Sequence, residues 1–323
     1  MIKYYYREPW RFSSERSKHR IKAVRALAAT FFTGIAIIEK IYLLSPRPSL
    51  ARLAPEVSEL IPQQGCNGTQ AKKAVSSLGV MTLNTAHGRK SNPHQILLSR
   101  PEIRANLDDI ARIFRRERPD IVALQETDGP SAWSGMFDHV EYLAEKGEYP
   151  YSIRGEHVKR KKNVYGTAIL STLPLTMPVS IKFSPAPPTF SKGAVISTVQ
   201  FPGNSGVDID IVSVHLDFAR KSVRQRQAEE LFDRLKERNR PLILMGDFNC
   251  EWVSKEQTLK SLSRMLNVKA YHPYAINLAT YPASGRRLDW ILISPELEFL
   301  SYRIFNDKMS DHLGVISEIG LAK

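Results

Sequence analysis

Short apolar runs alternate with amphipathic segments from residue 78 to the end of the chain. Runs of β-branched and aliphatic residues bounded by polar or turn-forming residues predict β-strands. They cover 79–84, 120–125, 166–171, 193–201, 207–216, 241–246, 288–294 and 314–319. Apolar residues at helical spacing over 103–114 and 223–235, each followed by a proline, predict two helices. Because strands and helices interleave without a repeat or a low-complexity tract, residues 78–323 are expected to form one domain.

The segment 151–163 breaks this pattern because it carries four consecutive basic residues at 159–162. It predicts an exposed basic loop. Such a run of charge is either simply solvated or contacts phosphate or lipid head groups, and the sequence leaves both readings open.

The first 77 residues have a different character, with a basic and aromatic stretch over 1–25 and no charged residue over 26–38. Residues 45–70 are rich in Pro, Gly and Gln, which is typical of a linker. An apolar span of roughly 20 residues is needed to cross a bilayer, so a membrane anchor would have to run over about 26–44 and include Glu39 and Lys40. The alternatives are an amphipathic surface helix and a soluble helix packed on the domain.

The charge distribution bears on both localisation and partners. The formal net charge is +13, but residues 1–79 hold 13 Lys and Arg against 5 Asp and Glu, which leaves 33 against 28 for the rest. Basic residues before the apolar run would keep the N-terminus in the cytoplasm and place the domain outside it, whereas without an anchor the protein would be soluble and cytoplasmic. Because the charge of the domain is nearly balanced, it gives only weak support for nucleic-acid binding. Two cysteines, Cys66 and Cys250, are too few for a disulfide framework.

Candidate chemistry is concentrated where the predicted strands end. The run 241–246 ends in Gly246 and is followed by Asp247, Phe248 and Asn249, so a carboxylate and an amide project on one face. Asp247 could orient or deprotonate a water molecule, while Asn249 could donate hydrogen bonds to a phosphate oxygen. By itself this motif is also common in ordinary turns.

Two further strand ends offer oxygen ligands. Glu126 follows the apolar run 121–124, and Asn84 ends the run 80–83. Mg²⁺ takes oxygen ligands and often only one or two protein carboxylates, which Glu126 could supply. Taken singly, Glu126 could instead pair with an arginine, and Asn84 could simply form a turn.

Two histidines complete the set. Asp311 and His312 precede a predicted strand, and Asp289 lies on another, where its carboxylate could fix the ring of His312 and raise its basicity. His215 emerges from a β-branched strand and is a candidate for contacting the phosphate or protonating the leaving oxygen.

These motifs, in this order, resemble those of the endonuclease/exonuclease/phosphatase superfamily over roughly residues 78–320. The resemblance rests on Leu83-Asn84, Leu124-Gln125-Glu126, Val214-His215-Leu216, Gly246-Asp247-Phe248-Asn249, Arg287-Leu288-Asp289-Trp290 and Ser310-Asp311-His312. It implies an α+β fold, a four-layer α/β/β/α sandwich with two mixed β-sheets packed face to face and flanked by helices. The site is then expected at one rim of the sheets.

The resemblance also implies roles for these residues. Asn84, Glu126 and Asp311 would hold one or two Mg²⁺ or Mn²⁺ ions, whereas Asp247 and Asn249 would act on the water and the phosphate. His312, supported by Asp289, would stabilise or activate the reacting phosphate. The family's deoxyribonuclease branch supports the equivalent of His215 with an acid, and that acid has no clear counterpart around 165–169.

The expected protein is therefore a metal-dependent hydrolase of phosphate esters, acting on a lipid or small phosphate ester. A deoxyribonuclease-like nuclease that takes nucleic acid as its substrate is the second hypothesis, and a non-catalytic membrane-tethered binding module is the third. Arg89 and His87, in the loop after Asn84, are candidates for substrate contact. No obligate protein partner is indicated.

Overall fold

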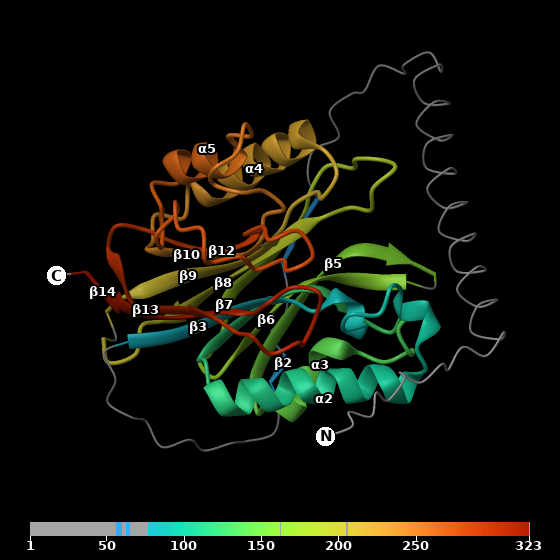
Figure 1. Cartoon of the computed structure of the whole chain (residues 1–323). Helices are drawn as coiled ribbons and strands as arrows, with labels where there is room; N and C mark the ends of the chain where they lie inside the picture. The colour runs from blue at the N-terminus through green and yellow to red at the C-terminus, as the bar shows by residue number, and fades with distance from the viewer. Residues whose placement is uncertain (1–55, 60–62, 65–76, 162, 205, 323) are drawn as a thin grey trace, which may run out of the picture. The chain divides into compact units, whose positions relative to one another are not determined.

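The strands of the computed structural model form two sheets that pack face to face (Figure 1). The described residues are 56–59, 63–64, 77–161, 163–204 and 206–322. One sheet, called the β9 sheet, has the order β1 (Glu56–Glu59), β7 (Thr176–Lys182), β8 (Gly193–Gln200), β9 (Asp208–His215), β10 (Leu242–Asp247), β12 (Asp289–Ile293) and β11 (Lys269–Ala270). The other, called the β3 sheet, has the order β13 (Leu297–Ile304), β14 (Val315–Leu321), β3 (Ser77–Asn84), β4 (Ile121–Asp128), β6 (Asn163–Ser171), β5 (Tyr151–Arg160) and β2 (Gln63–Gln64).

Helices cover the outer face of each sheet. The helices α2 (Arg100–Glu117) and α3 (His139–Gly147) lie on the β3 sheet, and α4 (Lys221–Leu235) and α5 (Thr258–Met265) lie on the β9 sheet (Figure 1). Short 3-10 turns, η1 (Ala86–Gly88) and η2 (Gln95–Leu97), follow β3. The predicted four-layer α/β/β/α sandwich is therefore confirmed.

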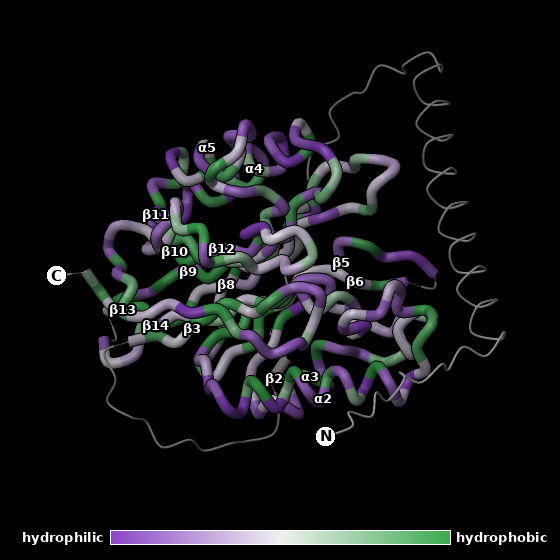
Figure 2. The backbone as a smooth tube through the Cα atoms, viewed as in Figure 1, coloured by the Kyte–Doolittle hydropathy of each residue, from purple (hydrophilic) through white to green (hydrophobic). Residues whose placement is uncertain are grey.

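Three apolar clusters hold these layers together. The central cluster lies between the sheets, where Val80 and Ile121 of the β3 sheet share it with Ile211, Ile243 and Ile291 of the β9 sheet. The other two lie under the helix pairs. The inner strand β10 is correspondingly hydrophobic along most of its length, whereas α2 alternates between hydrophobic and hydrophilic residues (Figure 2). Because the inner strands are buried on both faces, they appear in the sequence as continuous apolar runs, which is why these runs predicted the strands.

Two parallel strand pairs decide where the strand ends meet. The strands β3 and β4 pair in parallel and are joined through α2, and β9 and β10 pair in parallel and are joined through α4. The carboxyl ends of a parallel pair lie at the same edge of a sheet. Each sheet therefore presents two strand ends at one edge, and these ends carry the residues of the candidate site.

The predicted basic loop over 151–163 is wrong. Residues Tyr151–Arg160 form β5, which pairs with β6 from Tyr151 opposite Ser171 to Arg160 opposite Asn163. Ile153, His157 and Val158 are buried, with the partly exposed Arg154 and Glu156 between them, and the charges in the sequence obscured these buried positions. The exposed basic side chains Lys159, Arg160 and Lys161 are confined to the tip of the hairpin.

Several elements were not predicted. They are α3, α5, β7, β11, β13 and the short edge strands β1 and β2. The edge strands fall within the segment read as a tail and linker. For α3 the signal was present, because Asp138 accepts hydrogen bonds from the backbone N–H groups of Val140 and Glu141 as a helix N-cap.

The predicted anchor over about 26–44 lies outside the described residues, and so does most of the predicted tail and linker. Within the described part of the chain, no helix is both long and apolar enough to cross a bilayer.

Gly246 shows why a glycine precedes the candidate aspartate. Its φ is +149°, and a Cβ atom there would lie 1.9 Å from the carbonyl oxygen of Val214. Val214 is its register partner on the parallel strand β9. Only glycine allows β10 to approach β9 this closely one residue before Asp247.

Candidate active site

Four predicted residues sit at the ends of strands that share one edge of the sandwich. Asn84 ends β3, His215 ends β9 and Asp247 ends β10, whereas Asp289 begins β12. Because β12 runs antiparallel to β10, its first residue lies at the same edge as the last residue of β10. The register places Asp247 between His215 on one side and Asp289 on the other.

Asp247 connects the two sheets at this edge. Its Oδ2 accepts a 3.0 Å hydrogen bond from Nδ2 of Asn84, which belongs to the opposite sheet. The same oxygen lies 3.4 Å from Nε2 of His215 and 3.8 Å from Nε2 of His312. Only 1% of Asp247 is exposed, so each of these contacts is shielded from water.

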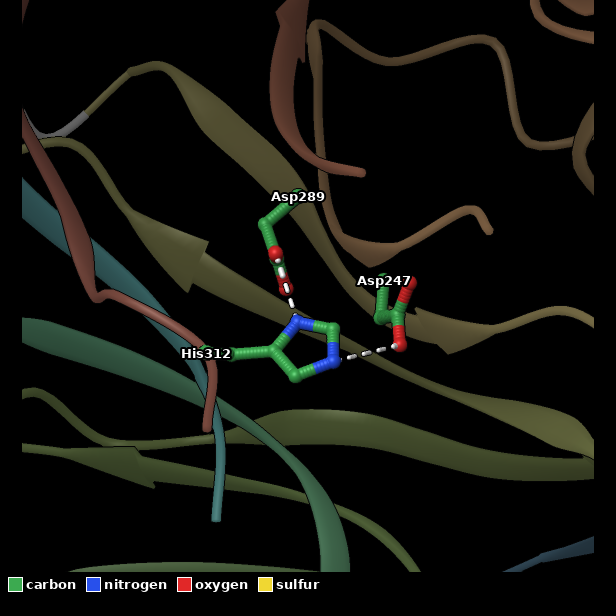
Figure 3. Close-up of side chains that lie close together, drawn as sticks. All are labelled: Asp247, Asp289 and His312. Atoms are coloured by element: carbon green, nitrogen blue, oxygen red, sulfur yellow. Dashed lines mark hydrogen bonds and ion pairs between the residues drawn. The ribbon is translucent and has the colours of Figure 1, made fainter. Parts of the chain in front are cut away.

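His312 lies between two carboxylates (Figure 3). Its Nδ1 lies 2.8 Å from Oδ2 of Asp289, and its Nε2 faces Asp247. Burial alone would lower the pKa of His312, but the charges of Asp289 and Asp247 outweigh burial and raise the pKa to about 10. A protonated ring at neutral pH is the consequence, and Asp289 sets its orientation.

Asp247 and His215 are shifted toward their neutral forms. Burial raises the pKa of Asp247 to about 7, and the neighbouring charge of Asp289 adds to this, whereas His312 and the hydrogen bond from Asn84 oppose it. Burial also holds the pKa of His215 well below its usual value, with the charge of Lys192 acting in the same direction. His312 and His215 therefore differ in charge at neutral pH.

The sequence predicted Glu126 at the end of a strand. The structure instead places it at an irregularity within β4. The strand continues to Asp128, and its register with β6 shifts between Leu124 and Thr127. Glu126 has a φ of +51°, which is uncommon for residues other than glycine. This backbone conformation turns the Glu126 side chain away from the regular alternation of the strand. Although burial raises the pKa of Glu126, the charges of His87 and Lys192 outweigh it and hold the pKa far below its usual value.

Both residues predicted to contact the substrate, His87 and Arg89, pair with carboxylates. His87 has Nδ1 2.6 Å from Oδ1 of Asp128 and Nε2 3.5 Å from Oε2 of Glu126. This places His87 where it can orient Glu126. Arg89 forms an ion pair of 2.5 Å with Oδ2 of Asp311. Both side chains are mostly buried, with 12% and 19% of each exposed.

Asn249 has a φ of +52° and lies just beyond β10. Its backbone N–H donates to Oδ1 of Asp247, and its Nδ2 donates to the carbonyl oxygen of Leu216. One of the two amide protons is thus committed to the backbone, and the other remains available for a ligand. Contacts or adjacency along the chain thus link Asn249 with seven other predicted site residues. The remaining two, His87 and Glu126, pair with each other and reach the rest through Lys192.

Two sets of residues are candidates for holding a hard cation. The sequence predicted Asn84, Glu126 and Asp311, whereas among the described residues the ligand atoms that lie within 4.8 Å of one another are those of Asp247, Asp289 and His312. In the second set Oδ2 of Asp289 already pairs with His312, although its Oδ1 is buried without a partner among the described residues. Glu126 is the better first ligand, because its carboxylate is ionised and 21% exposed, and its cationic neighbours are 3.5 and 3.6 Å away. Carboxylate and amide oxygens of this kind suit Mg²⁺ or Mn²⁺.

The sequence missed three residues that contact this site. Lys192 lies between His215 and Glu126, Asp128 holds His87, and the ring of Tyr165 packs edge-on against His87 at 4.9 Å. Lys192 and Tyr165 come from starts of antiparallel strands. A strand that pairs antiparallel with one member of a parallel pair has its first residues at the edge where that pair ends. This rule could have pointed to both residues.

The pairing of Asp289 with His312 gives a test. In the Asp289→Asn chain the pKa of His312 should fall by more than about one unit, because the largest contribution that raises it is removed. Nuclear magnetic resonance titration of ¹⁵N-histidine-labelled protein in chelator would measure this, with the His312→Gln chain to assign the signal.

Asp109→Asn serves as the control, since Asp109 lies on the outer helix α2, where its carboxylate pairs with Lys90 and Arg112. A His312 pKa that is unchanged by Asp289→Asn would contradict the pairing.

Comparison with known proteins agrees with this geometry. The model of the Endonuclease/Exonuclease/phosphatase family matches residues 81–312. Solved structures with a similar fold include an endonuclease/exonuclease/phosphatase from Beutenbergia cavernae, with a TM-score of 0.59 and 20% identity over 77% of this chain and 72% of that one. A family protein from Leptotrichia buccalis has a TM-score of 0.59 and 17% identity over 76% of this chain and 100% of its own. Sphingomyelinase C from Streptomyces griseocarneus has a TM-score of 0.55 and 18% identity over 76% of this chain and 99% of its own.

At these identities the structures show a shared fold. No curated protein matches the chain by sequence. The match to the family model covers most of the chain and includes all the strand ends described above. The chain belongs to the endonuclease/exonuclease/phosphatase family.

Proposed function

We propose that this protein is a divalent-metal-dependent phosphodiesterase or phosphatase that acts on a lipid or a small phosphate ester. The family consists generally of hydrolytic phosphoesterases that use a divalent metal. The observation that carries the proposal is the buried cluster in which Asp247 contacts Asn84, His215 and His312. An ionised Glu126 lies nearby, connected through Lys192.

Glu126, with Asn84 and Asp311, would hold Mg²⁺ or Mn²⁺, which when bound polarises a phosphoryl oxygen and offsets developing negative charge. The residues themselves supply the rest. Asp247 is placed to accept a proton from the attacking water, and a pKa near neutrality suits a general base. The attack forms a new oxygen–phosphorus bond in line with the ester bond that breaks, and the departing oxygen takes up a proton from solvent water.

The histidines take separate roles in this proposal. Protonated His312 would donate a hydrogen bond to a phosphoryl oxygen, and the free amide proton of Asn249 would do the same. The lowered pKa of His215 argues against the general-acid role considered for it and favours phosphate contact. The close neighbour of the His215 ring in this chain is the Lys192 ammonium.

Three observations favour a lipid or small phosphate ester over nucleic acid. Outside the first 79 residues the charge is nearly balanced, at 33 basic against 28 acidic residues. The sequence of the N-terminal segment is compatible with a membrane anchor. A sphingomyelinase C is among the proteins with a similar fold.

Hydrolysis should depend on the metal and on two named side chains. The purified chain is offered sphingomyelin, phosphoinositides, supercoiled DNA, RNA and bis-nitrophenyl phosphate, with Mg²⁺ or with chelator. At least one should be hydrolysed only with the metal, and Asp247→Ala or His312→Ala should slow that reaction by about a hundredfold or more.

Asp233→Ala, on the exposed face of α4, is the control and should leave the rate unchanged. Full activity in both site variants would refute the assigned roles. Preferential, salt-sensitive cleavage of DNA or RNA would replace the lipid proposal with the nuclease hypothesis.

The N-terminal segment gives a separate prediction. We propose that residues of about 26–44 anchor the protein in a membrane with the domain outside the cytoplasm. Cell fractionation should then find the whole chain with membranes, and a chain starting at Ser45 in the soluble fraction. That shorter chain keeps the edge strands β1 and β2. If both chains are equally soluble, the protein is not anchored this way.

A further inference from the structure

Lys192 is a buried cation that the proposed mechanism does not use. It precedes β8, whose first residue, Gly193, is the register partner of His215. Only 7% of Lys192 is exposed. Lysine is rarely buried to this extent without an anionic partner, so its surroundings need to be accounted for.

The chain is fixed where Lys192 enters the site. Its carbonyl oxygen accepts a 3.0 Å hydrogen bond from the backbone N–H of Phe183. At Gly193 a Cβ atom would lie 2.2 Å from the carbonyl oxygen of Ile181 and 2.4 Å from Nδ1 of His157. Because no other residue fits at Gly193, the lysine side chain starts from a backbone held in one place.

The neighbours of the Lys192 ammonium leave much of its hydrogen-bonding capacity unused. Its Nζ lies 3.1 Å from Nε2 and 3.3 Å from Nδ1 of His215. These nitrogens flank one ring carbon, so an atom this close to both approaches the face of the ring. Such an approach satisfies at most one of the three ammonium protons through a lone pair.

The one carboxylate within 4 Å of Lys192 among the described residues is that of Glu126, at 3.6 Å. Charge-assisted hydrogen bonds are usually shorter, about 2.7–2.9 Å. His87 shares Glu126 as well, and in the proposed function Glu126 also binds the divalent cation. Asp128 pairs with His87, so Glu126 is left to offset Lys192 and the divalent cation. Its single negative charge cannot offset both, and the His215 ring offers no negative charge. An additional anion is needed.

We propose that Lys192 binds a non-bridging oxygen of the phosphoryl group that is being hydrolysed. This inference rests on the proposed function and adds a catalytic residue to it. A phosphoryl group that meets Asp247 and His312 also lies beside His215, over whose ring the ammonium is held. Negative charge grows on these oxygens as water attacks, and a fixed cation in a dry site stabilises that charge strongly.

Binding of inorganic phosphate separates this proposal from a purely structural role. Isothermal titration calorimetry with Mg²⁺ present would compare the full chain with its Lys192→Met and Lys192→Arg variants. Lys192→Met should weaken phosphate binding about tenfold or more, the scale of a lost hydrogen bond to a charged group, and Lys192→Arg should weaken it less. Lys269→Met, an exposed position on the edge strand β11, should bind phosphate as the unaltered chain does.

Kinetics give the second measurement. For whichever ester the unaltered chain hydrolyses, Lys192→Met should lower kcat/KM by about a hundredfold, with Lys192→Arg recovering part of it. Thermal unfolding of each variant shows which of them are folded, and the Lys192→Arg chain carries the test if Lys192→Met does not fold.

Failure of this proposal can be told apart from failure of the proposed function. If Lys192→Met binds phosphate as tightly as the unaltered chain, or if the unaltered chain binds none at millimolar concentration, Lys192 has no role in phosphate binding. If Lys192→Met binds Mg²⁺ more weakly but phosphate as tightly as before, the proposal is likewise overturned. The role of Lys192 would then be only to pair with Glu126. Absence of hydrolysis of every ester would refute the proposed function, while the phosphate titration would still decide the role of Lys192.

Discussion

A parallel pair of strands carries both of its carboxyl ends to one edge, and this protein stacks two such pairs face to face. Residues from β3 and β4 thereby meet residues from β9 and β10, although Asn84 and Asp247 are far apart in the chain. The hydrogen bond from Asn84 to Asp247 joins the two sheets at that edge. Antiparallel neighbours add their first residues, which is why Asp289 and Lys192 arrive from the beginnings of strands. The position of every other side chain in the site depends on this arrangement.

Burial at the same edge has opposite effects on neighbouring groups, depending on the charges beside them. Glu126 stays ionised because cations surround it, whereas Asp247, deeper and beside Asp289, shifts toward the protonated form. His312 gains a proton between two carboxylates, and His215 loses one next to Lys192. Similar side chains are thus separated into a ligand, a base, a cationic donor and a neutral contact, and this separation makes phosphate-ester chemistry feasible near neutral pH.

Much of this could be predicted from the sequence, because buried strands leave apolar runs and their polar ends stand out against them. The eight predicted strands and both predicted helices exist, with ends that either coincide or differ by at most three residues. The hairpin of β5 was missed because charged residues stand among its buried positions and its register is irregular. The irregularity at Glu126 was missed because a left-handed backbone leaves no pattern in composition. Lys192 was overlooked for another reason. Its importance comes from its contacts with His215 and Glu126 on other strands, which a single sequence does not show. The roles assigned to the ten site residues remain predictions.

Convergence of the two sheets' strand ends on one cation can be observed directly. Crystals of the protein grown with Mn²⁺ would give an anomalous scattering peak wherever the ion binds. The peak is predicted at about 2 Å from the Glu126 carboxylate, on the side that faces Asp247 and His312. An ordered Mn²⁺ elsewhere on the protein, with Glu126 holding none at saturating concentration, would contradict the convergence of these residues on one metal centre.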